Sequence, residues 1–158
     1  MQFQRINRSD PEKVFIVAKN TYSTNSLTNG QATMWDYATD ADGVGVTLPA
    51  DGTTRAGHYG AAFAGIATAT IAAGDYGLLQ VYGYHSAVRV RTHTGGNPAV
   101  AAGTGLSCVD AVFALASYPA AAAATSTITL HNADWVAFAL AAQASWTTKA
   151  IAVFIKAL

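Results

Sequence analysis

The sequence predicts a small all-β domain, a β-sandwich or a jelly-roll or β-barrel-like fold, preceded by an N-terminal arm. Segments rich in β-branched and aromatic residues recur about every ten residues, and clusters of Gly, Asp and Asn separate them. No alternation of strand and helix patterns competes with this interpretation. The chain has 158 residues, the size of a single domain. We therefore expect an arm over residues 1–13 and one β domain over residues 14–158.

The arm is mostly polar. It carries five charged side chains and only two apolar anchors after Met1: Arg5, Arg8, Asp10, Glu12 and Lys13 against Phe3 and Ile6. Two interpretations stay open, a segment that docks on a partner and a frayed chain end. The arm lacks the apolar run of a secretion signal, so we expect a protein made in the cytoplasm.

The first half of the domain is expected to hold four strands, each bounded by turn residues. They cover residues 14–19, 31–37, 44–48 and 61–70. In the second strand Thr33, Trp35 and Tyr37 share one face. Leu27-Thr-Asn-Gly30 and Asp40-Ala-Asp-Gly43 are predicted turns. Residues 49–60, rich in Gly, Asp and Thr, are a predicted exposed loop with a contact function.

A central β-hairpin is predicted for residues 71–91, IAAGDYGLLQVYGYHSAVRVR. The two glycines around Asp75 favour a tight turn, and a strand is expected after it over residues 78–84. Residues 83–87 break this run. A second strand then follows at residues 88–91, where two valines face one side and two arginines the other.

The second half repeats the same kind of turn. Val100-Ala-Ala-Gly103-Thr104 echoes Ile71-Ala-Ala-Gly74-Asp75, which indicates one structural device, a tight glycine turn that leads into a strand. Strands are expected at residues 106–115, 125–130, 135–144 and 150–158. In residues 135–144 alanine favours a helix, whereas the alternation of apolar residues with alanine favours a strand, and we predict a strand. The apolar last strand is expected to be paired inside the sheet.

The composition is low in charge. Charged residues make up 11% of the chain, against roughly 25% in an average soluble protein. Nine basic residues balance nine acidic ones, which disfavours nucleic acid and anionic membranes as partners. No apolar stretch approaches the ~20 residues of a membrane-spanning helix. Either a partner covers part of this surface or a neutral exterior of small residues is tolerated.

The residues that could carry chemistry are scattered. His58, His85, His93 and His131 lie in or next to predicted loops without metal-ligand spacing, and we interpret them as solvated. The single cysteine, Cys108, lies in an apolar run and is expected in the core. The run Asp36–Gly43 lacks the glutamate that closes a calcium loop, so it is interpreted as a solvated turn. We therefore expect no enzyme, no catalytic residues, no metal and no cofactor.

A pattern of turn and strand motifs runs through most of residues 12–158. It consists of Leu27-Thr-Asn-Gly-Gln31, Asp42-Gly43-Val44, Ile71-Ala-Ala-Gly-Asp-Tyr-Gly77 with Gln80, Val81 and Gly83, Ala101-Ala-Gly-Thr-Gly-Leu106, and the β-prone C-terminus. This pattern resembles the head decoration, or capsid cement, proteins of tailed bacteriophages. The resemblance implies a β-rich subunit, usually a trimer, that sits without catalysis on the outer capsid surface where coat subunits meet.

The expected function is therefore that of a structural virion protein that binds a phage capsid and clamps adjacent coat subunits. Its partners would be the major capsid protein and further copies of itself in a homotrimer. The residues expected to contact the capsid or another copy are Phe3, Arg5, Ile6, Arg8, Trp35, Tyr59 and Tyr84. The alternative is a carbohydrate-binding virion or secreted β-sandwich module that stacks exposed aromatic residues on sugars. A hydrolytic enzyme would need the histidines and aspartates to converge in one cleft.

Overall fold

The computed structural model describes residues 12–40, 43–49, 62–92, 99–109, 111–117, 135–144 and 147–157, and the structural statements below concern these ranges. The ranges contain nine strands and no α-helix, so no helix in them is long and apolar enough to cross a membrane. The strands are β1 (Val14–Asn20), β2 (Ala32–Trp35), β3 (Gly45–Thr47), β4 (Phe63–Ala67), β5 (Tyr76–Thr92), β6 (Gly105–Val109), β7 (Val112–Ser117), β8 (Ala137–Ala139) and β9 (Lys149–Lys156). The predicted all-β fold is confirmed.

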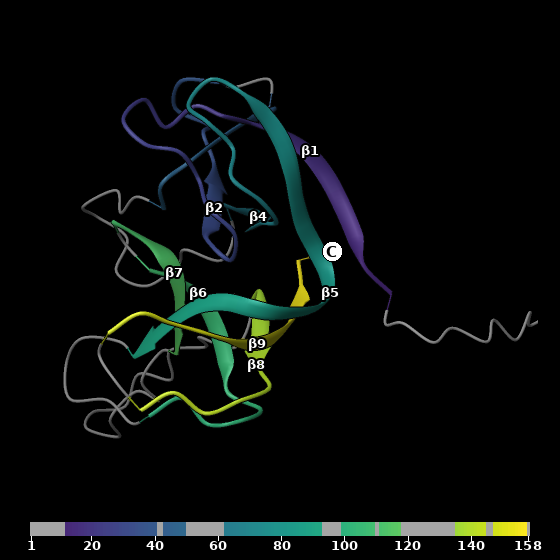
Figure 1. Ribbon diagram of the computed structural model, residues 1–158, viewed down its shortest axis with the longest axis vertical. Helices are drawn as coiled ribbons and strands as arrows, with labels where there is room; N and C mark the ends of the chain where they lie inside the picture. Colours follow the sequence, from purple (N-terminus) through teal and green to yellow (C-terminus); the bar gives the residue numbers. More distant parts are fainter. Residues whose placement is uncertain are drawn as a thin grey trace, which may run out of the picture.

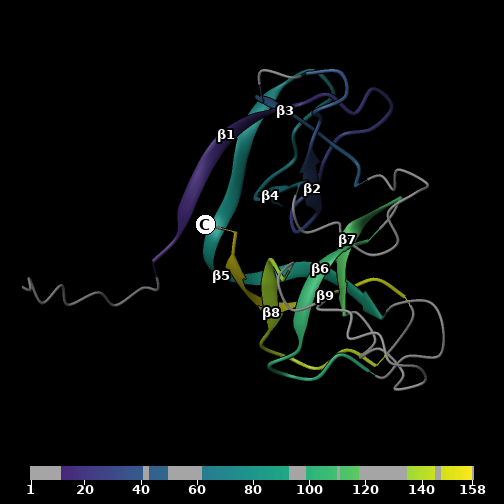
Figure 2. The same ribbon diagram turned by 180° about the vertical axis from the view of Figure 1, so that it is seen from behind.

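The strands close into two rings that share β5 (Figures 1 and 2). In the first ring β1 pairs with β3, β3 with β2, β2 with β4 and β4 with the first half of β5, which returns to β1. In the second ring the second half of β5 pairs with β7, β7 with β6, β6 with β8 and β8 with β9, which returns to β5. The fold is thus barrel-like in both halves.

The two rings have the same topology. Every pairing in the first ring recurs four strands later in the second: the parallel pair β1–β3 matches the parallel pair β5–β7, and all other pairs are antiparallel. The isolated bridges recur as well, Leu27 with Ile71 in the first ring and Val100 with Gln143 in the second. The chain is therefore a tandem structural repeat. In it β5 is the last strand of one unit and the first strand of the next.

The predicted glycine-turn device is confirmed and occurs three times in the described ranges. An apolar bridging residue is followed three positions later by a glycine at positive φ, and a strand begins two positions after the glycine: Leu27 and Gly30 (82°), Ile71 and Gly74 (83°), Val100 and Gly103 (86°). A residue with a β-carbon is disfavoured in this left-handed conformation by about 1–2 kcal/mol. The sequence similarity between the turns at Ile71 and Val100 does not follow the structural repeat. In the repeat Val100 corresponds to Leu27, and Ile71 is the residue that forms the β-bridge with Leu27.

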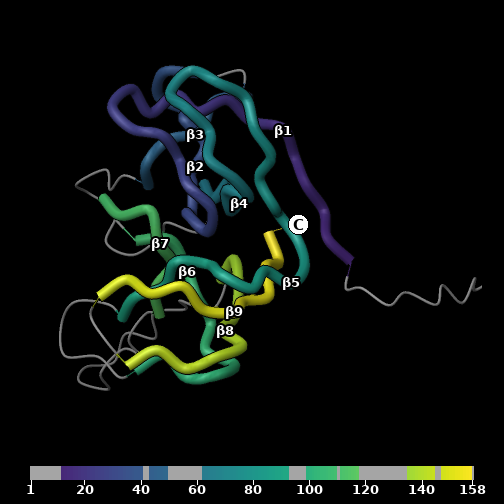
Figure 3. The backbone as a smooth tube through the Cα atoms, viewed as in Figure 1, coloured from purple at the N-terminus to yellow at the C-terminus, as the bar shows by residue number. Residues whose placement is uncertain are grey.

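The predicted central hairpin is wrong beyond its first turn. Residues 76–92 form one strand, β5, which runs along the first ring and then turns across the second (Figure 3). At the bend Gly83 has a φ of 98°, and the register with β9 shifts between His85 and Val88. Such a β-bulge adds residues to one strand without ending it. The alternation after the bulge is confirmed, because the two valines are buried and the two arginines are partly exposed.

The single strand predicted for residues 106–115 is also wrong. The segment forms an antiparallel hairpin of β6 and β7, with Val109 opposite Val112. Ala111 lies in the turn at a φ of 53°, and its N–H donates to the carbonyl of Pro49 at 2.8 Å. An alanine in a conformation that usually requires glycine leaves no turn signal in the sequence.

The other strand predictions within the described ranges hold: the strand predicted at residues 14–19 extends to Asn20, and the rest are shorter than predicted. In residues 135–144 the strand is β8, in which two alanines are fully buried while Phe138 is partly exposed. The last strand, β9, is paired on both sides, with β8 and β5. Tyr37 lies beyond the end of β2, so the face predicted for three residues holds for Thr33 and Trp35 alone. The expected strand at 125–130, the turn at 93–98, the loop residues 50–60 and the arm residues 1–11 lie outside the described residues.

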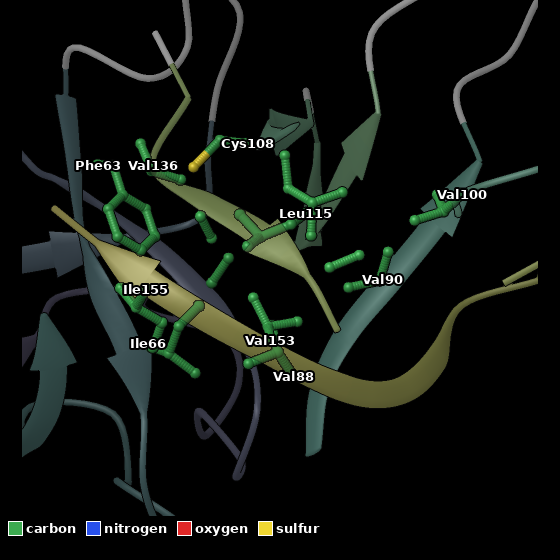
Figure 4. Packing of buried hydrophobic residues seen from close by; sticks show 14 residues of the cluster. Phe63, Ile66, Val88, Val90, Val100, Cys108, Leu115, Val136, Val153 and Ile155 are labelled. Atoms are coloured by element: carbon green, nitrogen blue, oxygen red, sulfur yellow. The ribbon is translucent and has the colours of Figure 1, made fainter. Parts of the chain in front are cut away.

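Two clusters of buried side chains hold the rings together. The first ring is filled by small and medium side chains: Ala18, Leu27, Val46, Ala64, Ala67, Ile71 and Leu79. The larger cluster lies in the second ring, but it includes Ala32, Phe63 and Ile66 from the first (Figure 4). In return Phe113 of β7 packs against the first cluster. The outer side of the first ring is therefore packed against the second ring.

Candidate interaction surfaces

Two of the seven residues predicted to make contacts are described, Trp35 and Tyr84. Trp35 ends β2 and packs against the core cluster of the first ring. Tyr84 lies on β5, is partly exposed, and stands opposite Phe154 of β9. The other five residues lie outside the described ranges: Phe3, Arg5, Ile6, Arg8 and Tyr59.

A row of aromatic side chains crosses the outer face of the second ring. Tyr84, Phe154 and Phe138 stand opposite one another on β5, β9 and β8, and directly paired residues point to the same face of a sheet. The rings of Phe138 and Phe154 are stacked with centroids 5.2 Å apart, and Tyr82 meets Phe154 edge to face at 5.3 Å. We call these four residues, together with Trp135, the aromatic row.

Trp135 extends the row to β6. Phe138 stands opposite Gly105, and the indole of Trp135 lies over this glycine, where a β-carbon would be 2.1 Å from a ring carbon. Trp135 nevertheless remains 38% exposed. The missing side chain at Gly105 thus makes room for an aromatic ring that faces solvent.

A second apolar surface lies on the first ring, where β1 and β5 form an antiparallel ribbon. Phe15, Val17, Tyr76 and Leu78 point outward from it and are 44, 62, 63 and 50% exposed. Val17 stands directly opposite Leu78. We call these four residues the ribbon patch. The inward residues of the same ribbon, such as Ala18 and Leu79, are fully buried.

The outward face of the ribbon is therefore largely apolar as well, with Lys19 opposite Tyr76 at one end. An antiparallel sheet with one face toward water usually alternates apolar and polar residues. Contiguous exposed apolar residues, in contrast, mark protein contacts on soluble proteins. The sequence did carry this signal, because Val14-Phe-Ile-Val-Ala18 is an unbroken apolar run. Such a run predicts a strand but does not show that its outward side chains stay exposed.

A cleft of about 290 Å³ lies between the two rings. Arg89 contributes to its wall, and its guanidinium donates to the hydroxyl of Thr28 at 2.7 Å. Tyr22 and Phe113 also line the cleft and meet edge to face at 5.2 Å. The side chains of Asn25 and Gln31 add amide groups. The cleft thus combines one cation, aromatic rings and neutral hydrogen-bonding groups.

Two titratable side chains, His85 and Cys108, are buried in the fold. His85 is buried within β5, so its prediction as a solvated loop residue is wrong; the other three histidines lie outside the described ranges. Burial, and next the charge of Lys13, lowers the pKa of His85, and its Nδ1 accepts a hydrogen bond from the N–H of Ala87 at 3.1 Å. Cys108 is confirmed as a core residue, and burial raises its pKa to about 12.

Two threonine hydroxyl groups form hydrogen bonds with Asp36, the first residue of the acidic turn. Asp36 accepts hydrogen bonds from the hydroxyl of Thr21 at 2.7 Å and from that of Thr39, and these bonds lower its pKa. No group of three or more His, Cys, Asp or Glu side chains that could hold a metal ion occurs in the described ranges.

Comparisons with known proteins do not place the chain in a family. No protein-family model matches it, and no curated protein is similar to it.

Proposed function

We propose that this chain is a structural virion protein that binds the outer surface of a phage capsid and clamps adjacent coat subunits. It would be made in the host cytoplasm and act without catalysis. The motif pattern from Leu27 to Leu106 supports this proposal through its resemblance to capsid decoration proteins. The observation that carries it is the presence of two separate apolar surfaces, the ribbon patch on one ring and the aromatic row on the other.

A clamp needs two contact surfaces in a fixed relation: one that binds a coat subunit, and one that joins this chain to the rest of the clamp. Here β5 runs through both rings, and side chains of the first ring are part of the second ring's core. The two surfaces are therefore held by one packed frame. Several modest contacts linked in this way raise the overall affinity without any single strong site.

We assign the ribbon patch to the coat protein. β1 begins at Val14, directly after the arm that we expect to dock on the partner. An arm and an adjacent apolar ribbon would form one continuous contact region. A neutral chain also brings no net charge that could oppose binding, and its binding should depend weakly on salt.

The experiment compares two tyrosines of equal exposure. Tyr76 in the ribbon patch and Tyr37 outside it are both 63% exposed. With purified coat-protein shells, Tyr76→Ser should lower the shell-bound fraction and the protection against thermal rupture, whereas Tyr37→Ser should leave both unchanged. A wild-type chain that neither binds shells nor delays their rupture would refute the proposal. Equal losses in both variants would refute the assignment of the ribbon patch.

The inter-ring cleft favours a second candidate function, glycan binding. Arginine and edge-to-face aromatic rings suit a sugar that carries a carboxylate. Binding to acidic glycans on an array that Arg89→Met abolishes would support this candidate. Binding that the substitution leaves unchanged, or no binding at all, would remove it.

A further inference from the structure

The aromatic row has a counterpart in the first ring. By strand pairing, Tyr84, Phe154, Phe138 and Gly105 correspond to Phe15, Gln80, Ile66 and Ala32. Both rows cross their ring in the same order of strands. The two rows are therefore equivalent surfaces of a repeated unit.

The two rows differ in what covers them. In the first ring Ile66 and Ala32 are fully buried and Gln80 is 2% exposed, whereas Phe15, at the β1 end of the row, is exposed and belongs to the ribbon patch. Ile66 and Ala32 belong to the core cluster of the second ring, together with Phe63 (Figure 4). In the second ring Phe138 and Phe154 are partly exposed, as is Trp135. The surface that the first ring uses to pack against a ring of the same fold is thus open in the second.

We propose that the aromatic row is the contact between two copies of this chain. The only partner that the structure shows for this surface, in the described ranges, is another ring with the same topology, and a second copy supplies such rings. Aromatic side chains are enriched in protein contacts because they bury a large area with few rotatable bonds. The zero net charge of the chain adds no repulsion between copies.

This contact does not depend on capsid binding. It uses the second ring and leaves the ribbon patch of the first ring free for another partner. Self-association is therefore measured with the purified full chain alone, and its result is distinguishable from that of the shell-binding experiment.

Two substitutions test the row in different ways. Trp135→Ser removes its most exposed side chain. Ala152→Glu adds a charge beside it, because residue 152 lies two positions before Phe154 on the same face of β9 and is partly exposed. Tyr76→Ser in the ribbon patch is the matched control. Sedimentation velocity over a concentration series gives the association state, and thermal melting checks that each variant is folded.

The wild type and Tyr76→Ser should associate with the same dissociation constant, and each row variant should raise that constant at least about thirtyfold. A wild type that stays monomeric at ~100 μM would overturn the proposal, since such an affinity is too weak for a working contact. So would folded row variants that associate like the wild type, or a Tyr76→Ser variant that loses association equally.

Discussion

The indole of Trp135 occupies the space in which the side chain of residue 105 would lie. A β-carbon on Gly105 would stand 2.1 Å from one ring carbon and 2.4 Å from another. A tryptophan that is more than one third exposed is thus fixed in place by a glycine on a neighbouring strand.

Gly105→Ala should therefore displace the indole and destabilise the fold by about 1–3 kcal/mol, the usual range for overpacking. Urea unfolding of Gly105→Ala, Trp135→Ala and the double variant measures the coupling between the two sites. The alanine at 105 should be much less harmful when residue 135 is also alanine. Strictly additive free energies would show that the two residues do not compete for space.

Gly83 should be the least replaceable of the glycines in or next to β5. Its φ is 98°, and a β-carbon there would stand 2.0 Å from the carbonyl oxygen of Glu12. Gly74 has a φ of 83° but no atom within 4 Å of the same position. Gly74→Ala should cost about 1–2 kcal/mol, the conformational penalty alone, and Gly83→Ala distinctly more. Equal midpoints of chemical unfolding for the two variants would contradict the close approach.

The fold class followed from the sequence because strands and turns leave local signals. The glycine device was visible at Ile71–Asp75 and at Val100–Thr104, and both predictions hold. In the sequence the bend of β5 is only a break in the apolar pattern of the strand. A bulge and a hairpin turn use the same small and polar residues, so the sequence does not distinguish the two. The turn at Ala111 left no signal, since alanine rarely takes a positive φ.

The candidate surfaces were harder to predict than the strands. Equivalent positions of the repeat carry different side chains, such as Gln80 and Phe154 or Ile66 and Phe138, because one row is buried and the other is not. At these positions the two units are therefore dissimilar in sequence, and the strand pairing is what makes them comparable. Tyr84 is among the predicted contact residues, but Phe154 and Phe138 lie far from it in the chain, and only the strand pairing brings the three together.

Stability should decline as the pH falls below the ordinary pKa of histidine because of His85. Its pKa in the folded protein lies below the ordinary histidine value of 6.5. The unfolded chain therefore takes up this proton first, and the free energy of unfolding decreases from about pH 6.5 down to the folded pKa. Thermal melting between pH 8 and about pH 5.5, above the range in which most carboxylates titrate, should show this decline in the wild type and a smaller one in His85→Asn. Identical pH profiles would assign the decline to other groups.

Cys108 should be inert in the folded protein. Its thiol is fully buried with a pKa of about 12, and only a thiolate reacts readily with disulfide reagents. At pH 8 a chromogenic disulfide should label the native chain at the rate of unfolding, and the chain in guanidinium chloride within the mixing time. Rapid labelling of the native chain would place the thiol within reach of solvent.

The sharing of β5 also sets an order of events during synthesis. The first ring can close once residues 76–92 have left the ribosome, whereas the second must wait for residues 149–156. Until then the side chains of Ala32, Phe63 and Ile66 have no second core to enter. During synthesis the first ring therefore closes while its outer face is still exposed and apolar. At that stage a chaperone or another nascent chain could bind this face.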